Sequence, residues 1–417
     1  MPNKLKIGII GLGNRGTGLL EGVMLPMTED KFDILAVCDL YEDRVVKAAD
    51  SIEKTTNKRP IYTTDYKDIL KMPEIDAVVI SAAWEAHIDI TIDAMEAGKF
   101  VALEVGGAYT MHECWRLIDT YEKTHTEVML LENCCFGKRE LMALNMVRQG
   151  LFGKVSHCAG GYLHDLRSEI ITGKESRHYR LRNYINRNCE NYPTHEIGPI
   201  AKLLNINNGN RFTSLVSVSS CSHGLHEYAV ETKGADHPLS NINFNQGDVI
   251  TTVIKCANGE TVTITLDTTL SRSYSRGFTV RGTKGSYFED SDMIFLDSEH
   301  KEYEFNAKPL WGNAEKYEEK YNHPIWKDFI PKGGHDGMDW LTFEAFYDAA
   351  INHKHPPIDV YDTATYMCIT TLSEQSIATG SMPVAIPDFT HGKWYNRTDI
   401  EDGPYCLDII DINKELY

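Results

Sequence analysis

A glycine-rich turn near the N-terminus constrains this chain more than any other stretch. The apolar run 4–10 ("KLKIGII") leads directly into Gly11-x-Gly13-x-x-Gly16, and a helix-compatible segment follows. Glycines at this spacing permit a tight turn, a close backbone approach to a pyrophosphate and close packing of helix on strand. Asp39 ends the next apolar run, where a carboxylate can accept hydrogen bonds from a ribose 2′-hydroxyl. The pattern predicts a dinucleotide site, and the acidic group favours NAD over NADP because it repels a 2′-phosphate.

Strand-like and helix-like segments alternate through the first third of the chain. Short apolar runs of the buried parallel-strand kind occupy 4–10, 33–40, 76–81, 99–104 and 127–132. Helical segments between them include 86–97 and 110–124, and the first of these has an apolar stripe of Ile88, Ile90, Ile92 and Met95. This alternation predicts a doubly wound parallel sheet.

After about residue 150 the pattern changes to that of antiparallel strands. The strand-like stretches are 211–220, 248–270, 277–290 and 292–297, and a long helix is expected at about 360–379. Asn258-Gly259 predicts a two-residue hairpin, because both residues tolerate a positive φ. We therefore predict an α/β Rossmann domain (1–132) plus an α+β domain with an open, mostly antiparallel sheet (133–417). The second domain is expected to bind substrate and to form a homo-oligomer through its sheet, and the C-terminal segment is expected to pack back on the first domain.

Composition narrows the classes of partner. A length of 417 residues accommodates two domains with separate cores. The formal charge of −18 disfavours nucleic acid, because it repels phosphate backbones. No window approaches the roughly 18 apolar residues of a membrane span, and the N-terminus lacks the features of a secretory signal. The ten cysteines form no CxxC pair, so we expect neither a disulfide framework nor a zinc site, and a cytoplasmic location.

Polar and aromatic residues follow several of the predicted strands. They lie in "SAAWEAH" (81–87), "LEVGG" (103–107) and "LENCCFG" (131–137). Ligands of open α/β sheets bind off the carboxyl ends of the strands. We therefore expect Trp84, His87, Glu104 and Asn133 to lie at the cofactor.

The stretch "NYPTHEIGP" (191–199) places a phenol and an imidazole three residues apart, as Tyr192 and His195. The residues alone leave four interpretations open: a buried structural turn, a metal site, a hydride-transfer site, or a proton-transfer site on a sugar. A metal site would draw on His157, His164, Asp165 and His195, although their spacing fits no closed motif. The basic stretch 177–187 can likewise be read as a solvated helix face.

The whole arrangement resembles the superfamily of glucose-fructose oxidoreductase and inositol dehydrogenase. Within it, the chain resembles glycoside hydrolase family 109, the NAD-dependent α-N-acetylgalactosaminidases. The matching stretches include "GLGNRG", "VCDLY", "WEAH", "LENCCFG", "HDLR", "NYPTHEIGPIAKLLNIN", "GGHDGMDW" and "IPDFTHGKW", and they run from residue 8 to 394.

The resemblance implies a set of ligand-binding residues. With the fingerprint residues Gly11, Gly13 and Gly16, the implied NAD site consists of Asn14, Arg15, Asp39, Trp84, Glu85, Ala86, His87, Glu104, Val105 and Asn133. The implied sugar site consists of Tyr162, Arg180, Tyr192, Pro193, Thr194, His195 and Tyr274. No metal is implied.

The resemblance also implies a mechanism in which hydrolysis proceeds through a temporary oxidation at sugar carbon 3. The resulting ketone acidifies the hydrogen on carbon 2, elimination expels the group on carbon 1, water adds, and re-reduction restores the carbon 3 hydroxyl. We assign His195 to the carbon 3 hydroxyl, and Tyr192 to the carbon 2 proton or the leaving group.

The chain departs from its relatives at several positions. Most superfamily members carry Glu-Lys-Pro where this chain has Glu104-Val105-Gly106, and the missing lysine argues against an ordinary sugar dehydrogenase. Phe136 replaces an expected tyrosine, and Asn191 and Glu196 flank the substrate turn, so the sugar is the least constrained feature. The alternatives are the same mechanism on a glucoside, a galactoside or a sulfonated sugar, a net NAD-dependent sugar 3-dehydrogenase, and a non-catalytic sensor.

Overall fold

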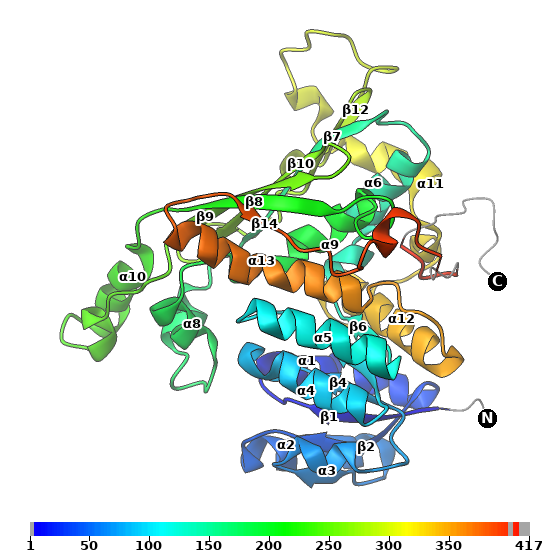
Figure 1. Cartoon of the computed structure of the whole chain (residues 1–417), viewed down its shortest axis with the longest axis vertical. Coiled ribbons are helices and arrows are strands. Elements are labelled where there is room, and N and C mark those ends of the chain that lie inside the picture. Colours follow the sequence, from blue (N-terminus) through cyan, green and yellow to red (C-terminus); the bar gives the residue numbers. More distant parts are fainter. Residues whose placement is uncertain (1–3, 399–402, 408–417) are drawn as a thin grey trace. The chain divides into compact units, whose positions relative to one another are not determined.

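The computed structural model describes residues 4–398 and 403–407, and its contacts divide the chain into two units (Figure 1). The first unit is built from the chain up to Phe136 together with Asp328–Thr365. The second is built from Gly137–Lys327 together with Tyr366–Arg397. Each unit thus joins a long continuous stretch to a segment from the last quarter of the chain.

The first unit contains a six-stranded sheet in the order β3-β2-β1-β4-β5-β6. Its strands are β1 (Leu5–Ile10), β2 (Phe32–Cys38), β3 (Ile61–Thr63), β4 (Ala77–Ile80), β5 (Phe100–Leu103) and β6 (Val128–Leu130). All neighbouring strands are parallel. This is the strand order of dinucleotide-binding doubly wound sheets, so the predicted fold class is confirmed.

Helices connect these strands close to the predicted positions. They are α1 (Asn14–Leu19), α2 (Glu42–Thr56), α3 (Tyr66–Leu70), α4 (Trp84–Glu96) and α5 (Met111–Thr124), with α12 (Met338–Asn352) added from the later segment. The four residues of the predicted apolar stripe of α4 are buried. The N-terminus of α5 is fixed by a capping box, in which the Thr110 side chain accepts from Glu113 N–H while the Glu113 carboxylate accepts from Thr110 N–H.

The second unit contains an eight-stranded sheet in the order β13-β12-β11-β7-β10-β9-β8-β14. Its strands are β7 (Val155–Leu163), β8 (Phe212–Ser219), β9 (Val249–Cys256), β10 (Thr261–Asp267), β11 (Thr279–Gly282), β12 (Gly285–Phe288), β13 (Met293–Leu296) and β14 (Val384–Ala385). Among these neighbours β7 and β10 run parallel, and the other pairs are antiparallel. The prediction of a mostly antiparallel sheet is confirmed.

The hairpin between β9 and β10 occurs where it was predicted, but its turn is of another kind. Only Gly259, with a φ of 109°, has the positive φ that we assigned to both turn residues; Asn258 does not. Gly259 N–H donates to Cys256 C=O, and Cys256 N–H donates to Glu260 C=O at 2.9 Å. The strands are therefore joined by a longer turn that ends in a glycine, and the two-residue prediction is wrong.

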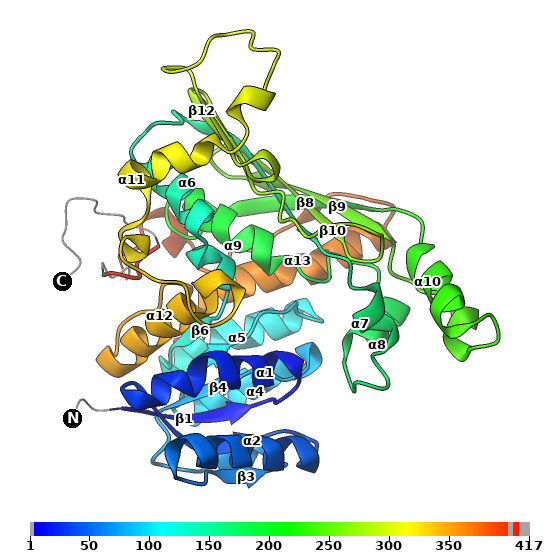
Figure 2. The ribbon, with the colours of Figure 1, turned by 180° about the vertical axis from the view of Figure 1, so that it is seen from behind.

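Helices of the second unit cover its sheet and connect its strands. They are α6 (Lys138–Arg148), α7 (Arg167–Ile171), α8 (Arg180–Asn186), α9 (Thr194–Leu203), α10 (Gly224–Lys233) and α11 (Glu318–Tyr321), and α13 (Val360–Ala378) continues into this unit. Figure 2 shows α6 and α9 beside the strands, and α9 contacts β7 extensively. Ser376 of α13 accepts a hydrogen bond from Ser217 N–H of β8, so the predicted long helix packs on the sheet.

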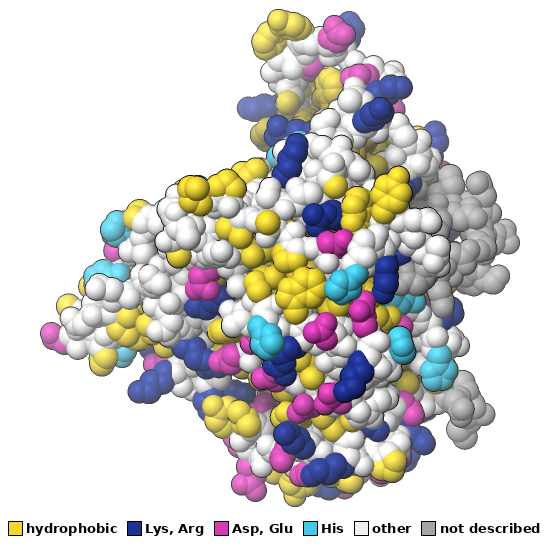
Figure 3. All heavy atoms as spheres, viewed as in Figure 1, with side chains coloured by type: hydrophobic (Ala, Val, Ile, Leu, Met, Phe, Trp, Pro, Cys, Tyr) yellow, Lys and Arg dark blue, Asp and Glu magenta, His cyan; other side chains and the backbone are white. Residues whose placement is uncertain are grey.

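The surface carries both signs of charge. On the face shown in Figure 3, Lys and Arg side chains lie among Asp and Glu side chains. The acidic groups would repel the phosphates of a nucleic acid wherever neighbouring basic groups attract them. Within the described part of the chain, none of the helices combines the length and the apolar character needed to span a bilayer.

We predict that a largely buried histidine, with a side chain 12% exposed, makes the stability of the first unit dependent on pH. His355 lies 2.8 Å from Asp359 and 3.3 Å from Glu127. Burial alone lowers the pKa of His355, but the two carboxylates outweigh it and raise the pKa to about 10. Because the folded pKa exceeds the unfolded value, this stabilisation is complete below about pH 6.5 and is lost as the pH rises to about 10.

The variant His355→Gln tests this expectation in denaturant titrations between pH 6 and pH 10. The wild type should exceed the variant in free energy of unfolding by roughly 3 kcal/mol at pH 6, and this difference should shrink towards pH 10. A difference that stays constant over the range would contradict the ion-pair explanation.

Candidate functional site

The glycine-rich turn has the geometry of a dinucleotide cradle. Gly11 has a φ of 100°, and a Cβ there would lie 2.4 Å from the backbone nitrogen of Ala82. A Cβ on Gly16 would lie 2.1 Å from Gly11 C=O. Gly13 differs, because its φ of −68° suits any residue and its Cβ would meet only Arg44, at 3.7 Å. Two of the glycines are thus required by the fold, whereas Gly13 leaves space for a ligand.

Asp39 connects the turn to the end of β2. Its carboxylate is buried and accepts hydrogen bonds from Leu12 N–H at 2.7 Å and from Tyr41 N–H at 3.0 Å, and Arg44 lies 3.5 Å away. Two carboxylate oxygens offer about four acceptor sites, so capacity remains for a ribose hydroxyl. The position fits the predicted role.

His87, at the start of α4, is a buried imidazole with one unsatisfied nitrogen. Its Nε2 lies 2.9 Å from Ala82 C=O and donates to it, which leaves Nδ1 as an acceptor without a partner in the described structure. Burial lowers the pKa of His87 to about 4, so the ring is neutral at physiological pH. A Cβ on Gly106 would lie 3.2 Å from this Nδ1 and 2.7 Å from Trp84, which explains why glycine replaces the usual proline.

Arg15, Glu104 and Asn133 meet in one charged cluster, although they follow three different strands, β1, β5 and β6. Arg15 Nε donates to Glu104 at 3.0 Å, and its two terminal nitrogens donate to Asp339 at 2.8 and 2.9 Å. Asn133 Nδ2 donates to the same Asp339 carboxylate at 2.7 Å. Asp339 lies in α12, within the "GGHDGMDW" stretch, and sequence reasoning gave it no role.

The remaining predicted cofactor residues accompany these groups. Glu85 and Ala86 lie in the first turn of α4, and Val105 N–H donates to Glu104 at 3.2 Å. Asn14 begins α1. Three features are suited to NAD: the open space beside Gly13, the unsatisfied buried nitrogen of His87 and the Asp39 carboxylate after β2.

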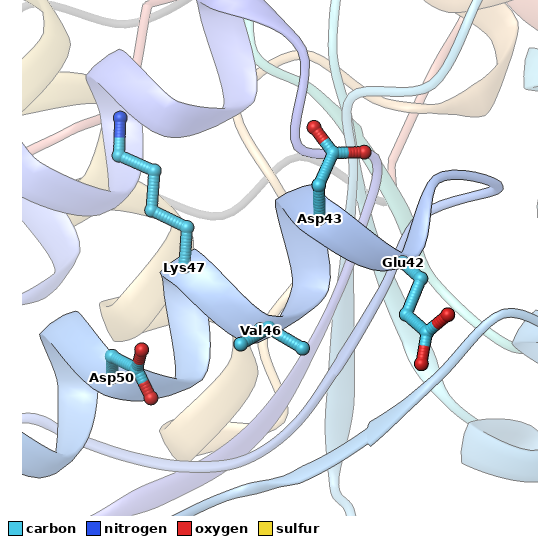
Figure 4. Close-up of a pocket in the computed structure, with 5 residues that line it drawn as sticks. All are labelled: Glu42, Asp43, Val46, Lys47 and Asp50. Atoms are coloured by element: carbon cyan, nitrogen blue, oxygen red, sulfur yellow. The ribbon is translucent and has the colours of Figure 1, made fainter.

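A pocket lies elsewhere on the first unit, along α2 (Figure 4). It is lined by Glu42, Asp43, Val46, Lys47 and Asp50. The lining contains three carboxylates and one ammonium group, so its charge disfavours an anionic pyrophosphate. We assign the dinucleotide to the glycine-rich turn and not to this pocket.

In the second unit, Tyr192 and His195 form a close pair. The Tyr192 hydroxyl lies 3.4 Å from His195 Nε2, and the two rings are perpendicular with centroids 4.8 Å apart. Tyr162, near the end of β7, packs against both rings at centroid distances of 4.5 and 5.5 Å. The structure therefore brings together the phenol and imidazole singled out from the sequence.

Arg180 places a buried cation beside this pair. Its guanidinium lies 5.2 Å from the Tyr192 ring centroid and 6.0 Å from that of Tyr162. Burial lowers the pKa of Arg180, but the nearby tyrosines and Glu169, at 2.9 Å, outweigh burial and raise it above the usual range. The basic stretch 177–187 is thus not merely a solvated helix face, and Glu169 is a partner that the sequence analysis missed.

His164 and Tyr274 extend the cluster towards solvent. His164 Nδ1 lies 3.3 Å from the Tyr162 hydroxyl, and its ring packs perpendicular to Tyr274 at 5.1 Å. Tyr274 is half exposed. The proposed metal ligands have other partners, since His157 bonds Thr261 and Asp165 pairs with Arg167.

The substrate turn is shorter than "NYPTHEIGP" suggests. Helix α9 begins at Thr194, so Gly198 and Pro199 lie inside a helix and do not close a turn. Oγ1 of Thr194 is buried and makes no hydrogen bond within the described part of the chain, which leaves it available to a ligand. Pro193 supplies the residue before the helix.

Two residues far along the chain brace this turn. Gln246 accepts from Asn191 Nδ2 at 2.6 Å and from Cys189 N–H at 3.2 Å, and it donates to Cys189 C=O at 3.0 Å. Ser373 accepts from Glu190 N–H at 2.9 Å. No motif marks Gln246 or Ser373 in the sequence, because their contacts arise only from the tertiary fold.

Glu190 adds a buried acid next to the turn. Its side chain is fully buried, and neither carboxylate oxygen has a hydrogen-bond partner in the described structure. Burial raises the pKa of Glu190 above its ordinary value. A carboxyl group in this position favours its neutral form.

Comparisons with known proteins agree with this two-part organisation. Residues 5–131 match the oxidoreductase family with an NAD-binding Rossmann fold, and residues 136–396 match the C-terminal domain of glycosyl hydrolase 109. An alpha-N-acetylgalactosaminidase from Tannerella forsythia is 39% identical over 94% of this chain and 88% of its own length. An alpha-N-acetylgalactosaminidase from Shewanella oneidensis is 36% identical over 94% of this chain and 86% of its own length.

Solved structures with low identity share the fold. A levoglucosan dehydrogenase bound to NADH and levoglucosan has a TM-score of 0.69 at 18% identity, and the alignment covers 92% of this chain and all of that one. A myo-inositol 2-dehydrogenase from Lactobacillus plantarum has a TM-score of 0.64 at 17% identity, with coverage of 92% and 100%.

Two alanine substitutions separate the structural glycines from the ligand-facing one. Gly16→Ala should lower the free energy of unfolding by about 2 kcal/mol, because its methyl group would overlap the backbone of the turn. Gly13→Ala should leave the unfolding midpoint of the NAD-free protein unchanged yet weaken NAD binding at least about 10-fold. Thermal unfolding and calorimetric titration measure the two effects, and unchanged affinity in Gly13→Ala would contradict the assignment.

The substitution Gln246→Leu tests the brace of the substrate turn. It removes four hydrogen bonds and leaves buried backbone and amide groups unpaired, so we expect a loss of about 2 to 4 kcal/mol in the free energy of unfolding. The neighbouring exposed Asn245→Ala serves as the control and should cost less than about 0.5 kcal/mol. Equal losses in both variants would show that Gln246 has no special role.

Proposed function

Because this chain belongs to glycosyl hydrolase family 109 and carries an NAD-binding Rossmann domain, we propose that it hydrolyses glycosides by transient oxidation at sugar carbon 3. N-acetyl-α-galactosaminides are the leading substrates, since two relatives bear that activity in their names. The observation that carries the proposal is the Tyr192–His195 pair beside buried Arg180.

Bound NAD would supply a reversible hydride acceptor for carbon 3 of the sugar. His195 is our candidate for the proton of the carbon 3 hydroxyl, because imidazole exchanges protons near neutral pH. Once carbon 3 is a ketone, the hydrogen on carbon 2 is acidic enough for a modest base. Tyr192 is our candidate for that proton or for the departing group at carbon 1, and its 3.4 Å separation from His195 Nε2 supports proton exchange between the two.

Arg180 is suited to the negative charge that develops during elimination. Removal of the carbon 2 proton produces an enolate, and a fixed buried cation stabilises such an oxyanion without reorganising. The contact with Glu169 holds the guanidinium in place, and the faces of Tyr162 and Tyr192 enclose it. Tyr162 and Tyr274 would hold or shield the sugar ring.

The predicted binding residues enter this proposal as two groups. For the sugar we propose Tyr162, Arg180, Tyr192, Pro193, Thr194, His195 and Tyr274, within the substrate domain at 133–417. For NAD we propose Gly11, Gly13, Asn14, Arg15, Gly16, Asp39, Trp84, Glu85, Ala86, His87, Glu104, Val105 and Asn133. We further propose a reducing cytoplasmic location, supported by cysteines that form no disulfide within the described residues. We also propose that copies pair through the second sheet, which exposes Val218 and Val253.

A net sugar 3-dehydrogenase is the second candidate. It is favoured by the fold shared with NADH-bound dehydrogenases. The absence of a lysine after Glu104 argues against a dehydrogenase. In most members of the superfamily that this chain resembles, a lysine at this position takes part in the chemistry of the substrate.

Cleavage of nitrophenyl glycosides by NAD-stripped protein tests the proposal. We expect cleavage of the N-acetyl-α-galactosaminide to require substoichiometric NAD, solvent deuterium to appear at carbon 2, and a 3-deoxy substrate to remain intact. His195→Ala and Tyr192→Phe should each lower the rate about 10²- to 10⁴-fold without changing NAD affinity. The exposed Tyr303→Phe is the matched control.

The same assay separates the two candidates. Equal cleavage with and without NAD would exclude the redox route. Stoichiometric NADH accompanied by an intact glycoside would identify a dehydrogenase.

A further inference from the structure

Asp339 is the centre of a charged cluster in the first unit, and it is not among the residues predicted to bind NAD. Its carboxylate receives Arg15 through two nitrogens, Asn133 at 2.7 Å and His335 Nδ1 at 2.8 Å. The Asp339 side chain is 3% exposed, whereas that of His335 is 50% exposed. Four donors on one nearly inaccessible carboxylate indicate a constructed arrangement and not an incidental surface pair.

The hydrogen bonds of Arg15 account for almost all of its donors. Its Nε–H points to Glu104, and Nη2 lies 2.9 Å both from Glu104 and from Asp339. One N–H of Nη1 donates to Asp339 at 2.8 Å. A guanidinium has five N–H groups. The fifth, on Nη1, lies 3.4 Å from His335 Nδ1, the nitrogen that also contacts Asp339, so a ligand at this edge of Arg15 would meet only the half-exposed imidazole.

The charges of the cluster hold Arg15 in a single orientation. Two carboxylates that are about 95% buried contact one cation whose side chain is 34% exposed. Bidentate, charge-assisted pairs of this kind are stronger and more directional than neutral hydrogen bonds. In support, Arg15 and His335 outweigh the effect of burial and hold the pKa of Asp339 well below its usual range.

Arg15 belongs to the glycine-rich turn itself, between Gly13 and Gly16. We propose that Asp339 is a positioning residue for NAD: it clamps Arg15 against Glu104, so that the turn presents one fixed guanidinium edge to oxygen atoms of the dinucleotide. Asp339 acts through Arg15 and does not itself need to contact the cofactor. The inference rests on NAD binding and not on the sugar chemistry.

NAD titrated calorimetrically into full-length, NAD-free protein tests the clamp. Asp339→Asn keeps the shape of the side chain but removes its charge, and we expect the Kd for NAD to rise about 10-fold. Arg15→Gln should raise it at least as much. Because Asp339 acts through Arg15, the double variant should bind NAD no more weakly than Arg15→Gln alone.

Controls distinguish positioning from general support of the fold. Asp348→Asn lies on the same helix but pairs with Lys354, and it should leave the Kd unchanged. His335→Gln removes one contact to Asp339 from a half-exposed residue, so it should fold even if Asp339→Asn does not, and should raise the Kd about threefold.

The proposal is overturned if His335→Gln and Asp339→Asn leave the Kd unchanged, or if Asp339→Asn weakens binding equally in the Arg15→Gln background. Failure of glycoside cleavage would leave these binding results intact, so the two proposals fail separately.

Discussion

The close approach of the first βα turn to the end of β4 determines where chemistry can take place in the first unit. Ser81 N–H donates to Ile10 C=O, and its hydroxyl donates to Gly11 C=O, both at 2.8 Å. Only glycine at positions 11 and 16 permits this approach. The segments that follow β1, β4 and β5 therefore lie close together. As a result, the glycine-rich turn, the neutral His87 and the charged cluster around Arg15 lie at one edge of the sheet.

Each unit contains an arginine whose guanidinium is held by neighbouring side chains, partly exposed in the case of Arg15 and buried in the case of Arg180. Arg15 is held by two carboxylates, and Arg180 is held by one carboxylate and by the faces of two tyrosines. A buried guanidinium such as that of Arg180 destabilises the fold unless it is paired. For the partly exposed Arg15, the two carboxylates fix the orientation of the side chain. The two environments differ in net charge. Two carboxylates contact the single cation of Arg15, whereas one carboxylate and two uncharged aromatic rings contact Arg180.

Sequence reasoning identified the elements with strong local signals. The buried parallel strands, α5 with its capping box and the Tyr192–His195 pair follow from apolar runs and short-range spacing. Strands β3 and β7 have weak local signals and were not predicted, because the three residues of β3 are largely exposed and β7 contains consecutive glycines. Asp339, Glu169 and Gln246 were not predicted either. Asp339 lies 324 residues from Arg15, and Gln246 lies 55 from Asn191, so only the folded chain reveals these pairings.

The packing of α9 on β7 links strand composition to the alignment of the reactive imidazole. A Cβ on Gly160 would lie 2.9 Å from the Cβ of Glu196, the residue that follows His195. Pro199 has no N–H to donate to the His195 carbonyl, so the first turn of this helix lacks one of its usual internal restraints. A methyl group at Gly160 would therefore displace the start of α9. This displacement would move the His195 ring away from Tyr192, although the methyl group would contact neither ring.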